Sequence, residues 1–467
     1  MLRMNGLVIC IGLAAGFAGR ASAAERFELR EEPADARVRY VAVELSVNGK
    51  LFPEPGPDKA IKLAVEARFE YGERRLEGTG REAQSLRAIR HYNLAKATIE
   101  AGDQTSISTL RKSQRLVVAQ GQSEGIDLFS PSGPLTYAEQ ELLRAPGDSL
   151  AVLGLLPTSA VEEKETWKAA DWVLPLLTGI EVVEKGEIEC QLESASATEA
   201  RIRFKGEVIG ATVGAAAALR VDGQYLYDRS QRLISQVEWA QTEKRAIGAV
   251  SPGLDVTARS KIVRSVAERP VHLIDRDLAD LPLEPNDANR LLMFDAPAWN
   301  VRFYYDRHWH LFHQNSDMAL LRLLDKGGLI AQCNIKRIAT AEPGKHLSRE
   351  QFQADIERAL GENFQEIVQT ETLKLKEGLF VERVVVVGTV PRKNAKNEPE
   401  PAPMQWIYYL VANPDGRQVS FVFSVDPAQI KELDSRDLSI VAGLEFLSPR
   451  AQPTPAIKPA ANAAGEK

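Results

Sequence analysis

Apolar and charged side chains alternate along much of the first half of the chain. The clearest case is KLAVEARFEY at 62–71, in which every second residue from Leu63 to Tyr71 is apolar and most of the others are charged. A period of two predicts a β-strand with one buried and one wetted face, and strands of this kind belong to antiparallel sheets. Related patterns predict further strands at 41–47, 86–98, 105–110, 115–120, 125–128, 188–192, 202–204, 225–227, 233–239 and 254–262.

The period changes near Thr136, where short helical patterns interrupt the strands. Thr136 and Glu139 have the spacing of a capping box, which predicts a helix that continues to Arg144. Ser149 to Leu156 form a second apolar helical stretch, and the segment from Trp167 to Leu177 carries another apolar patch. We expect these segments to lie inside or across the mouth of a curved sheet.

Two residue pairs that end in glycine interrupt the strand patterns. Asn48-Gly49 follows the strand at 41–47, and Asp222-Gly223 precedes the strand at 225–227. Asn-Gly and Asp-Gly pairs are typical of tight hairpin turns. We therefore predict that the chain reverses at each pair.

The second half of the chain begins after a stretch without sustained periodicity. Beyond it, an aromatic strand pattern at 303–311 and a helix that starts at Ser348, with Phe352 and Ile356 on its apolar side, indicate a smaller domain. The predicted fold class is α+β and rich in β-structure. Its parts are a signal peptide at 1–23, a curved antiparallel, half-barrel-like domain at 37–267, a linker at 268–291, a smaller antiparallel-sheet-plus-helix domain at 292–447 and a disordered tail at 448–467.

Composition and the first residues indicate where the protein works. The 467 residues carry a net charge of −6, with 26% charged and 44% hydrophobic residues, and this balance provides no basic face for nucleic acid. Arg3, the apolar run from Leu7 to Ala18 and the small residues Ala21-Ser22-Ala23 form a signal-peptide pattern. The alternative is an uncleaved anchor, although the run is too short to span a bilayer. We expect an extracytoplasmic protein, periplasmic or secreted, with no transmembrane segment after cleavage.

Cysteine usage and short motifs restrict the cofactors. Outside the signal peptide the chain has Cys190 and Cys333, which are interpreted as two separate buried thiols or as one interdomain disulfide. Phosphate-binding loops, dinucleotide glycine fingerprints and Cys-x-x-Cys pairs do not occur in the sequence. No cofactor is expected.

Two resemblances to known families follow from these patterns. The ribbons from Val38 to Gln120, the helical interruption at 136–156 and the stretch GQYLYDRSQRLISQVEW at 223–239 are similar to the lipoprotein-carrier type of half-barrel, in LolA/LppX-like families. The stretches LSREQFQADIERAL and WIYYLVANPDGRQVSFVFSV give residues 292–447 a resemblance to PsbP-like α/β domains. The first resemblance implies an apolar cavity for acyl chains, and the second implies a binding or assembly role without catalysis.

Gly121-Gln122-Ser123-Glu124-Gly125 matches the G-x-S-x-G nucleophile elbow. That motif needs a strand before the serine and a helix after it. Here the pattern after Gly125 is that of another strand. We therefore interpret the segment as a hairpin turn, with a nucleophilic Ser123 as the alternative.

His308 and His310 are candidate metal ligands, because His-x-His is a spacing that metal sites use. On a strand the two imidazoles share a face with Asp306. The alternative is a surface strand whose opposite face packs on the core. No partner motif elsewhere completes a metal site.

Three functions remain open from the sequence. We favour a non-enzymatic binding protein that holds a lipid or other apolar ligand in the half-barrel. The second hypothesis is a structural or assembly module that binds protein partners, and the third is a metal-dependent hydrolase that uses His308 and His310. The residues expected to line the apolar cavity are Leu63, Val65, Phe69, Leu153 and Trp167.

Overall fold

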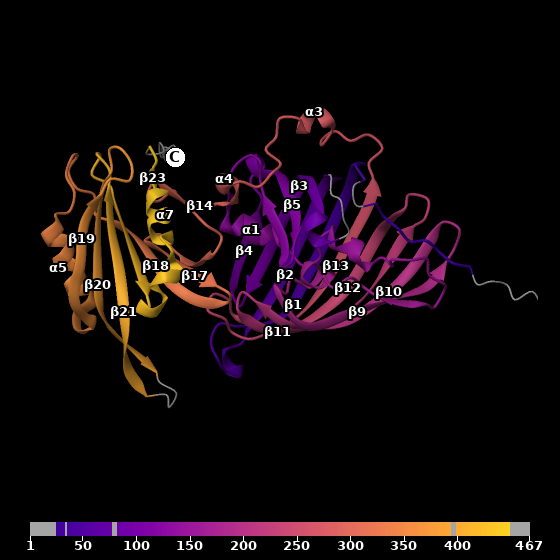
Figure 1. Ribbon diagram of the computed structural model, residues 1–467, viewed down its shortest axis with the longest axis horizontal. Helices are drawn as coiled ribbons and strands as arrows, with labels where there is room; N and C mark the ends of the chain where they lie inside the picture. The colour runs from indigo at the N-terminus through magenta and orange to yellow at the C-terminus, as the bar shows by residue number, and fades with distance from the viewer. Residues whose placement is uncertain (1–24, 33–34, 77–81, 394–397, 449–467) are drawn as a thin grey trace, which may run out of the picture.

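The chain folds into two lobes that lie side by side (Figure 1). The computed structural model describes residues 25–32, 35–76, 82–393 and 398–448. The predicted signal peptide lies outside these residues, as does the predicted tail apart from Ser448. Within these ranges, no helix is long and apolar enough to cross a membrane.

The larger lobe is built on one curved antiparallel sheet of 12 strands. Their order is β6-β5-β3-β2-β1-β13-β12-β11-β10-β9-β8, and β4 pairs with β3. The sheet is open rather than closed into a barrel, which confirms the predicted half-barrel-like architecture. The strands are β1 (Arg39–Phe52), β2 (Ile61–Arg75), β3 (Arg87–Ala101), β4 (Gln104–Thr109), β5 (Leu116–Gln122), β6 (Gly125–Phe129), β8 (Thr166–Lys168), β9 (Val182–Ala195), β10 (Glu199–Thr212), β11 (Ala215–Asp228), β12 (Leu233–Arg245) and β13 (Gly253–Val266).

Period-two alternation gives this sheet one apolar and one polar face. Phe69 of β2 is buried while its neighbour Arg68 is exposed. Phe69 pairs with Val43 of β1, which in turn pairs with Ile262 of β13. Apolar side chains therefore form rows across neighbouring strands, as the register of a half-buried sheet requires.

The two predicted turns at Asn48-Gly49 and Asp222-Gly223 are wrong, because both glycines lie inside strands. Gly49 pairs with Val256, and Gly223 pairs with Trp239. A Cβ atom on Gly223 would lie 2.5 Å from the Cβ atom of Trp239. Glycine is therefore needed for close packing within the strand rather than for a reversal.

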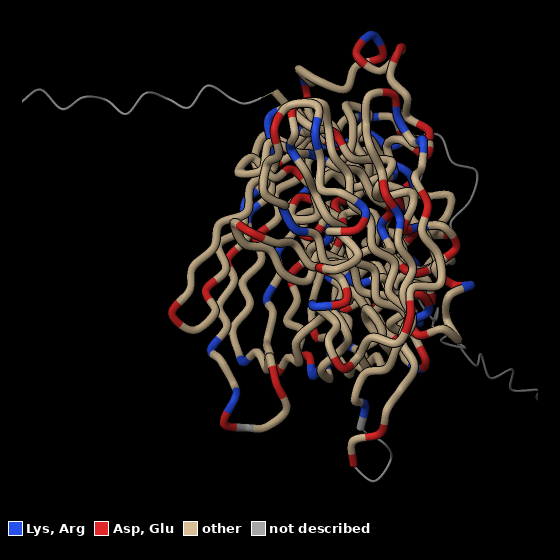
Figure 2. The backbone as a smooth tube through the Cα atoms, turned by 90° about the vertical axis from the view of Figure 1, so that its left-hand side faces the viewer, with Lys and Arg blue, Asp and Glu red and all other residues tan. Residues whose placement is uncertain are grey.

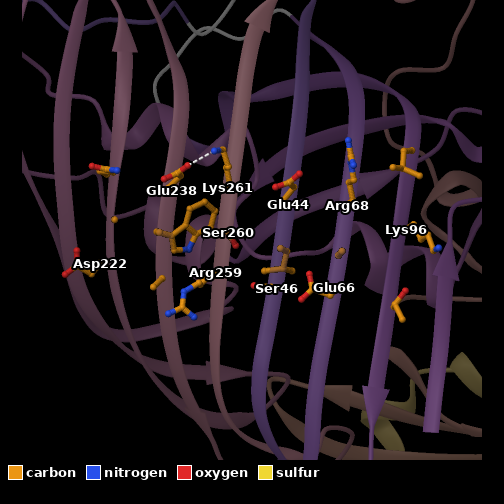
Figure 3. Close-up of a pocket in the computed structure, with 18 of the residues that line it drawn as sticks. Glu44, Ser46, Glu66, Arg68, Lys96, Asp222, Glu238, Arg259, Ser260 and Lys261 are labelled. Carbon is orange, nitrogen blue, oxygen red and sulfur yellow. Dashed lines mark ion pairs between the residues drawn. The ribbon is translucent and has the colours of Figure 1, made fainter.

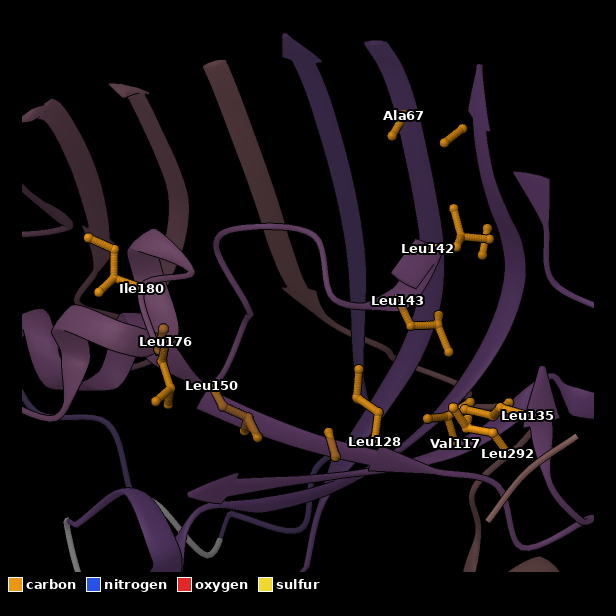
Figure 4. Packing of buried hydrophobic residues seen from close by; sticks show 14 of the residues in the cluster. Ala67, Val117, Leu128, Leu135, Leu142, Leu143, Leu150, Leu176, Ile180 and Leu292 are labelled. Carbon is orange, nitrogen blue, oxygen red and sulfur yellow. The ribbon is translucent and has the colours of Figure 1, made fainter. Parts of the chain in front are cut away.

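Short helices fill the apolar side of the curved sheet (Figure 4). Thr136 and Glu139 form the predicted capping box at the start of α1 (Tyr137–Leu143). Leu142, Leu150 and Leu176 belong to one buried cluster with the sheet. The other helical segments of this lobe are α2 (Val173–Thr178), η1 (Pro57–Lys59), η2 (Ala83–Ser85), η3 (Lys112–Gln114) and η4 (Ala151–Leu155).

The smaller lobe is built on a seven-stranded antiparallel sheet. Its order is β16-β17-β18-β22-β21-β20-β19. Helix α5 (Arg349–Leu360) begins at the predicted cap Ser348 and packs Phe352 and Ile356 against this sheet. The strands are β16 (Trp309–Gln314), β17 (Met318–Asp325), β18 (Gly328–Ile338), β19 (Phe364–Leu373), β20 (Phe380–Lys393), β21 (Pro399–Ala412) and β22 (Gln418–Val425). Shorter helices are η5 (Gly361–Asn363), η6 (Pro427–Gln429), α6 (Ile430–Leu433) and α7 (Arg436–Ala442).

A third, four-stranded sheet connects residues of both predicted domains. Its order is β23-β15-β14-β7, and β7 runs parallel to β14. Leu135 of β7 pairs with Leu292 of β14, and both side chains are buried together (Figure 4). Its strands are β7 (Leu135–Thr136), β14 (Leu292–Ala296), β15 (Val301–Tyr305) and β23 (Glu445–Phe446). The predicted linker contains the short helices α3 (Asp275–Leu278) and α4 (Asp287–Arg290).

Two hairpin turns also meet between the lobes. The β10–β11 turn contains Gly214 and the β17–β18 turn contains Gly327. A Cβ atom on Gly214 would lie 2.2 Å from the carbonyl oxygen of Gly327, so the backbones touch. An ion pair of 2.6 Å between Arg307 and Asp127 supports the same junction.

Cys190 and Cys333 are both buried and unpaired, as the interpretation of two separate thiols requires. Burial raises the pKa of each thiol above its usual range. Both therefore carry their protons at neutral pH.

Candidate functional site

A hollow of about 940 Å³ lies on the polar side of the curved sheet (Figure 3). Ser46 and Ala240 contribute small side chains to its lining. Glu44, Glu66, Glu193, Asp222 and Glu238 contribute carboxylates, and Arg68, Lys96, Arg203, Arg259 and Lys261 contribute cations. Positive and negative groups are thus balanced in this hollow.

Strand register explains much of this charge pattern without a ligand. Lys261 of β13 lies opposite Glu238 of β12, and their side chains form an ion pair of 2.7 Å. Arg203 and Asp222 form a second pair, at 3.0 Å. Opposite charges across neighbouring strands are a normal way to stabilise the solvent face of a sheet. Figure 2 shows the same mixing of positive and negative residues throughout the chain.

A second cavity, of about 470 Å³, lies where the two lobes meet, and we name it the interlobe cavity. It is lined by parts of α1, α2 and the hairpins β5–β6, β10–β11 and β12–β13, and by His310 of the smaller lobe. Leu143, Leu176 and Val250 give it apolar walls. A cavity with apolar walls and a few polar groups has the form of most small-molecule sites.

Carboxylates outnumber cations around the interlobe cavity. Five carboxylates line it, whereas the cations are Arg144 and Arg245. Asp148 is compensated by two hydrogen bonds from Arg90, and Glu243 by an ion pair with Arg245. The carboxylates without such close partners among the described residues are Glu124, Glu141 and Glu181.

Glu141 is the most perturbed of these carboxylates. Half of its side chain remains accessible, and its nearest cation is Arg144, whose Nη1 atom lies 4.0 Å from Glu141 Oε1. Burial in the cavity wall raises the pKa of Glu141, Arg144 opposes this, and the charge of Glu181 raises it further. Perturbed carboxylates in a cleft are typical of binding and catalytic sites.

The β10–β11 turn positions Glu181. The carboxylate of Glu181 accepts a hydrogen bond of 2.7 Å from the backbone N–H of Val213. Val213 has a φ of 49° and is followed by Gly214 with a φ of 74°. A β-branched residue in this region is strained, and the bond to Glu181 is one contact that holds it there.

His310 and His308 do not converge. The His310 ring meets the Tyr137 ring edge-on at 6.3 Å in the cavity, whereas His308 bonds to Asp306, with 3.0 Å between Nδ1 and Oδ1. Burial, Arg144 and His308 lower the pKa of His310 to about 4, so its imidazole is neutral at pH 7. Across the described part of the chain, no three His, Cys, Asp or Glu side chains are grouped to hold a metal ion.

The G-x-S-x-G segment forms the β5–β6 hairpin turn, as interpreted from the strand pattern after it. Gln122 pairs with Gly125 across the turn, so the strand-to-helix geometry of a nucleophile elbow is absent at this position. Glu124 and Gly125 line the interlobe cavity, and Ser123 is not among its lining residues.

Of the five residues predicted to line an apolar cavity, three share β2, and the other two lie in η4 and β8 of the larger lobe. Leu63 and Phe69 are buried in β2, Val65 is half-buried in the same strand, and the indole of Trp167 donates to the carbonyl of Leu155 at 2.9 Å. Leu153 lines a cavity of about 130 Å³ beside Trp172. Their role in ligand binding stays a prediction.

Sequence reasoning missed Glu141, Glu181 and Val213. Glu141 lies in a short helix with an ordinary polar pattern, and Glu181 precedes a strand in which charged residues are common. Their proximity depends on how the lobes and hairpins meet. The one local signal is a valine before a glycine at a hairpin tip, because such a turn favours asparagine or glycine at that position.

Comparisons with known proteins find distant likenesses to solved structures. No family model matches the chain, and no curated protein matches its sequence. Lipovitellin, solved for its lipid–protein interactions, is 12% identical with a TM-score of 0.31 over 52% of this chain, which spans 27% of that chain. The Ran-binding protein Mog1p of Saccharomyces cerevisiae is 11% identical with a TM-score of 0.26, over 34% of this chain and 95% of that chain. A Bacteroides thetaiotaomicron protein is 10% identical with a TM-score of 0.24, over 33% of this chain and 48% of that chain.

These likenesses are too weak to carry an argument about function. The resemblances to lipoprotein-carrier half-barrels and to PsbP-like domains are not confirmed.

Proposed function

We propose that this protein is a non-enzymatic, extracytoplasmic binding protein that holds a small organic cation in the interlobe cavity. The observation that carries the proposal is the pair Glu141 and Glu181. Both carboxylates line one cavity, and the charge of Glu181 disfavours ionisation of Glu141, whose partner Arg144 lies 4.0 Å away. A bound ammonium or guanidinium group would relieve this repulsion.

The size and walls of the cavity suit a small ligand. Its volume of about 470 Å³ falls within the range of small-molecule sites, roughly 300–1,000 Å³. Leu143, Pro175 and Leu176 offer apolar contact for the carbon part of a ligand, while the carboxylates hold its charged end.

Two features support binding rather than catalysis. The neutral His310 faces the aromatic ring of Tyr137, and among the described residues no carboxylate is hydrogen-bonded to His310 to orient it as a base. Burial also raises the pKa of Tyr137, which keeps its hydroxyl protonated. General acid–base catalysis is most effective when the pKa values lie near the operating pH, and the pKa values of His310 and Tyr137 are shifted away from it in opposite directions.

The experiment compares three probes of similar length and different charge: cadaverine, 1,5-pentanediol and glutarate. Equilibrium binding to the full chain should favour cadaverine over the diol by at least about tenfold, which is about 1.4 kcal/mol, and glutarate should not bind. Glu141→Gln should remove the preference, and Glu54→Gln, an exposed carboxylate outside the cavity, should keep it. Equal binding of the three probes would contradict the proposal.

A second candidate function is binding of an apolar ligand in the larger lobe. The cavity of about 130 Å³ beside Leu153 and Trp172 supports it as a site for part of an apolar chain. Native mass spectrometry of the purified protein, followed by organic extraction, should release a lipid-sized molecule. Leu153→Glu should abolish that release, and a bare polypeptide mass from the unaltered protein would contradict this candidate.

A further inference from the structure

The first described residues, 25–32, form an extended segment that we name the N-terminal strap. Its inward residues Phe27, Leu29 and Glu31 are 5%, 1% and 4% exposed, and the residues between them are exposed. Phe27 exchanges two backbone hydrogen bonds with Val161, at 2.7 and 3.0 Å. The hydroxyl of Tyr227 donates to the carbonyl of Arg30 at 2.7 Å. The strap is therefore a separate strand-like piece laid against the larger lobe.

Glu31 inserts a carboxylate among three buried arginines. Arg264 binds both of its oxygens, Arg75 donates to Oε1 at 2.7 Å, and Arg39 Nε lies 3.6 Å away. The backbone N–H of Ile234 donates to Oε2 at 3.2 Å. These arginines come from β1, β2 and β13, so the sheet itself builds the anion site and the strap supplies the anion.

Charge in this site is matched by the strap rather than by the sheet alone. Burial opposes ionisation of Glu31, yet Arg264, Arg75 and Arg39 outweigh it and lower its pKa to about 2. Without Glu31, Arg39 would keep its ion pair of 2.6 Å with Asp35 and the charge of Glu73 on β2 would remain nearby, but the three guanidinium groups would lose the carboxylate that they share. An anion is therefore required at this position in the folded protein.

An apolar cavity adjoins this anion site. The cavity of about 130 Å³ is lined by Leu29 and Glu31 of the strap and by Leu86, Leu153 and Trp172 of the lobe. The strap thus presents a carboxylate to arginines and apolar side chains to apolar walls. That combination has the chemistry of a fatty carboxylate.

We propose that the strap occupies a binding site for an anionic amphiphile, whose carboxylate replaces Glu31 among Arg39, Arg75 and Arg264 and whose chain replaces Leu29 beside Trp172. This inference rests on the second candidate function and names its ligand class. It is independent of the interlobe cavity. Ligand and strap compete for the same groups, so the tethered strap weakens the apparent affinity.

Chemical rescue of Glu31→Ala tests the site in the full chain. The variant should unfold at a lower temperature than the unaltered protein, and dodecanoate below its micelle concentration should raise that temperature by at least about 3 °C. Acetate, which lacks the chain, and dodecanol, which lacks the charge, should not. The matched control is Glu28→Ala, an exposed position of the same strap, which should show no rescue.

Equal shifts with dodecanoate and dodecanol, or equal shifts in Glu31→Ala and Glu28→Ala, would overturn the proposal. If Glu31→Ala does not fold, Leu29→Ala keeps the carboxylate and weakens the apolar hold of the strap. Intrinsic tryptophan fluorescence, to which Trp172 in the cavity wall contributes, should then report dodecanoate binding at least tenfold tighter than in the unaltered protein, and unchanged affinity would overturn the site. Extraction of a lipid from the native protein without any rescue would place the apolar ligand elsewhere.

Discussion

The Glu31 cluster and the interlobe cavity both contain carboxylates, yet they shift the pKa values of Glu31 and Glu141 in opposite directions. Glu31 is fully enclosed and meets three arginines, so its pKa falls to about 2. Glu141 is half exposed, its nearest cation is 4.0 Å away, and its pKa rises. The more deeply buried carboxylate is therefore the more strongly ionised one.

The difference shows that a carboxylate without a close cation, rather than a shallowly buried one, identifies a site that is still open to a ligand. In the Glu31 cluster the chain supplies its own anion to a preformed cation site. In the interlobe cavity the chain supplies carboxylates and leaves them short of cations. The first region resembles a bound state and the second a free state.

Removal of the Glu31 carboxylate should cause the largest loss of stability. Glu31→Ala leaves three buried arginines without their shared partner, which costs about 3–5 kcal/mol. Urea denaturation at pH 7 measures the loss. The matched control is Glu32→Ala, whose carboxylate is 53% exposed and, among the described residues, pairs with Arg30, so its effect should be near zero. Similar losses in the two variants would contradict the charge-matching account.

The stability gap between the unaltered protein and Glu31→Ala should depend on pH. The pKa of Glu31 is lowered from 4.5 to about 2, so its stabilisation is fully present above pH 4.5 and is lost as the pH falls toward 2. Denaturation curves at several pH values should show the gap closing over that interval. A gap that is constant with pH would show that Glu31 acts through packing alone.

Separation of the lobes should affect the interlobe cavity and spare the Glu31 cluster. Gly214→Ala places a Cβ atom 2.2 Å from the carbonyl oxygen of Gly327. We expect the free energy of unfolding to fall by about 1–3 kcal/mol as a result. Gly344→Ala is the matched control, because Gly344 has a φ of 77° against 74° for Gly214 and an added Cβ atom meets nothing within 4 Å. Equal losses would assign the effect to backbone strain rather than to the lobe contact.

Neutralisation of Glu141 should have the smallest effect on stability and the opposite sign. Glu141→Gln removes a charge that is paired only loosely, at 4.0 Å, with Arg144, so at pH 7 it should stabilise the protein by a few tenths of a kcal/mol, given the exposure of the side chain. The raised pKa means that protonation of Glu141 favours the folded state below pH 4.5, and this benefit is lost as the pH rises through the raised value. The variant should therefore become more stable than the unaltered protein only as the pH rises. Equal stability of the two proteins at high pH would contradict the electrostatic picture of the cavity.

Local patterns were enough to predict the sheet architecture. Alternation from Leu63 to Tyr71 identified β2 and its buried face, and the Thr136 capping box identified α1. Both depend on neighbours in sequence, which the chain displays directly. The turn prediction at Asp222-Gly223 was wrong because Gly223 lies inside a strand, where its lack of a side chain leaves room for Trp239 of the neighbouring strand. No local pattern in the sequence reveals this contact.

The candidate site was much less predictable than the fold. Glu141, Glu181 and His310 come from α1, from the segment before β9 and from the smaller lobe. Their meeting depends on the contact between lobes, which the alternation pattern does not encode. Glu31 was equally hidden, because the N-terminal strap has no periodicity long enough to predict the inward orientation of this side chain.

The most direct test of the open interlobe site is the proton balance of cadaverine binding. Calorimetry in two buffers of different ionisation enthalpy, at a pH slightly above the ordinary glutamate value of 4.5, measures protons released per ligand bound. The account predicts net proton release, because the bound cation favours the ionised form of Glu141, and no release in Glu141→Gln. Binding without proton release, or equal release in the variant, would contradict it.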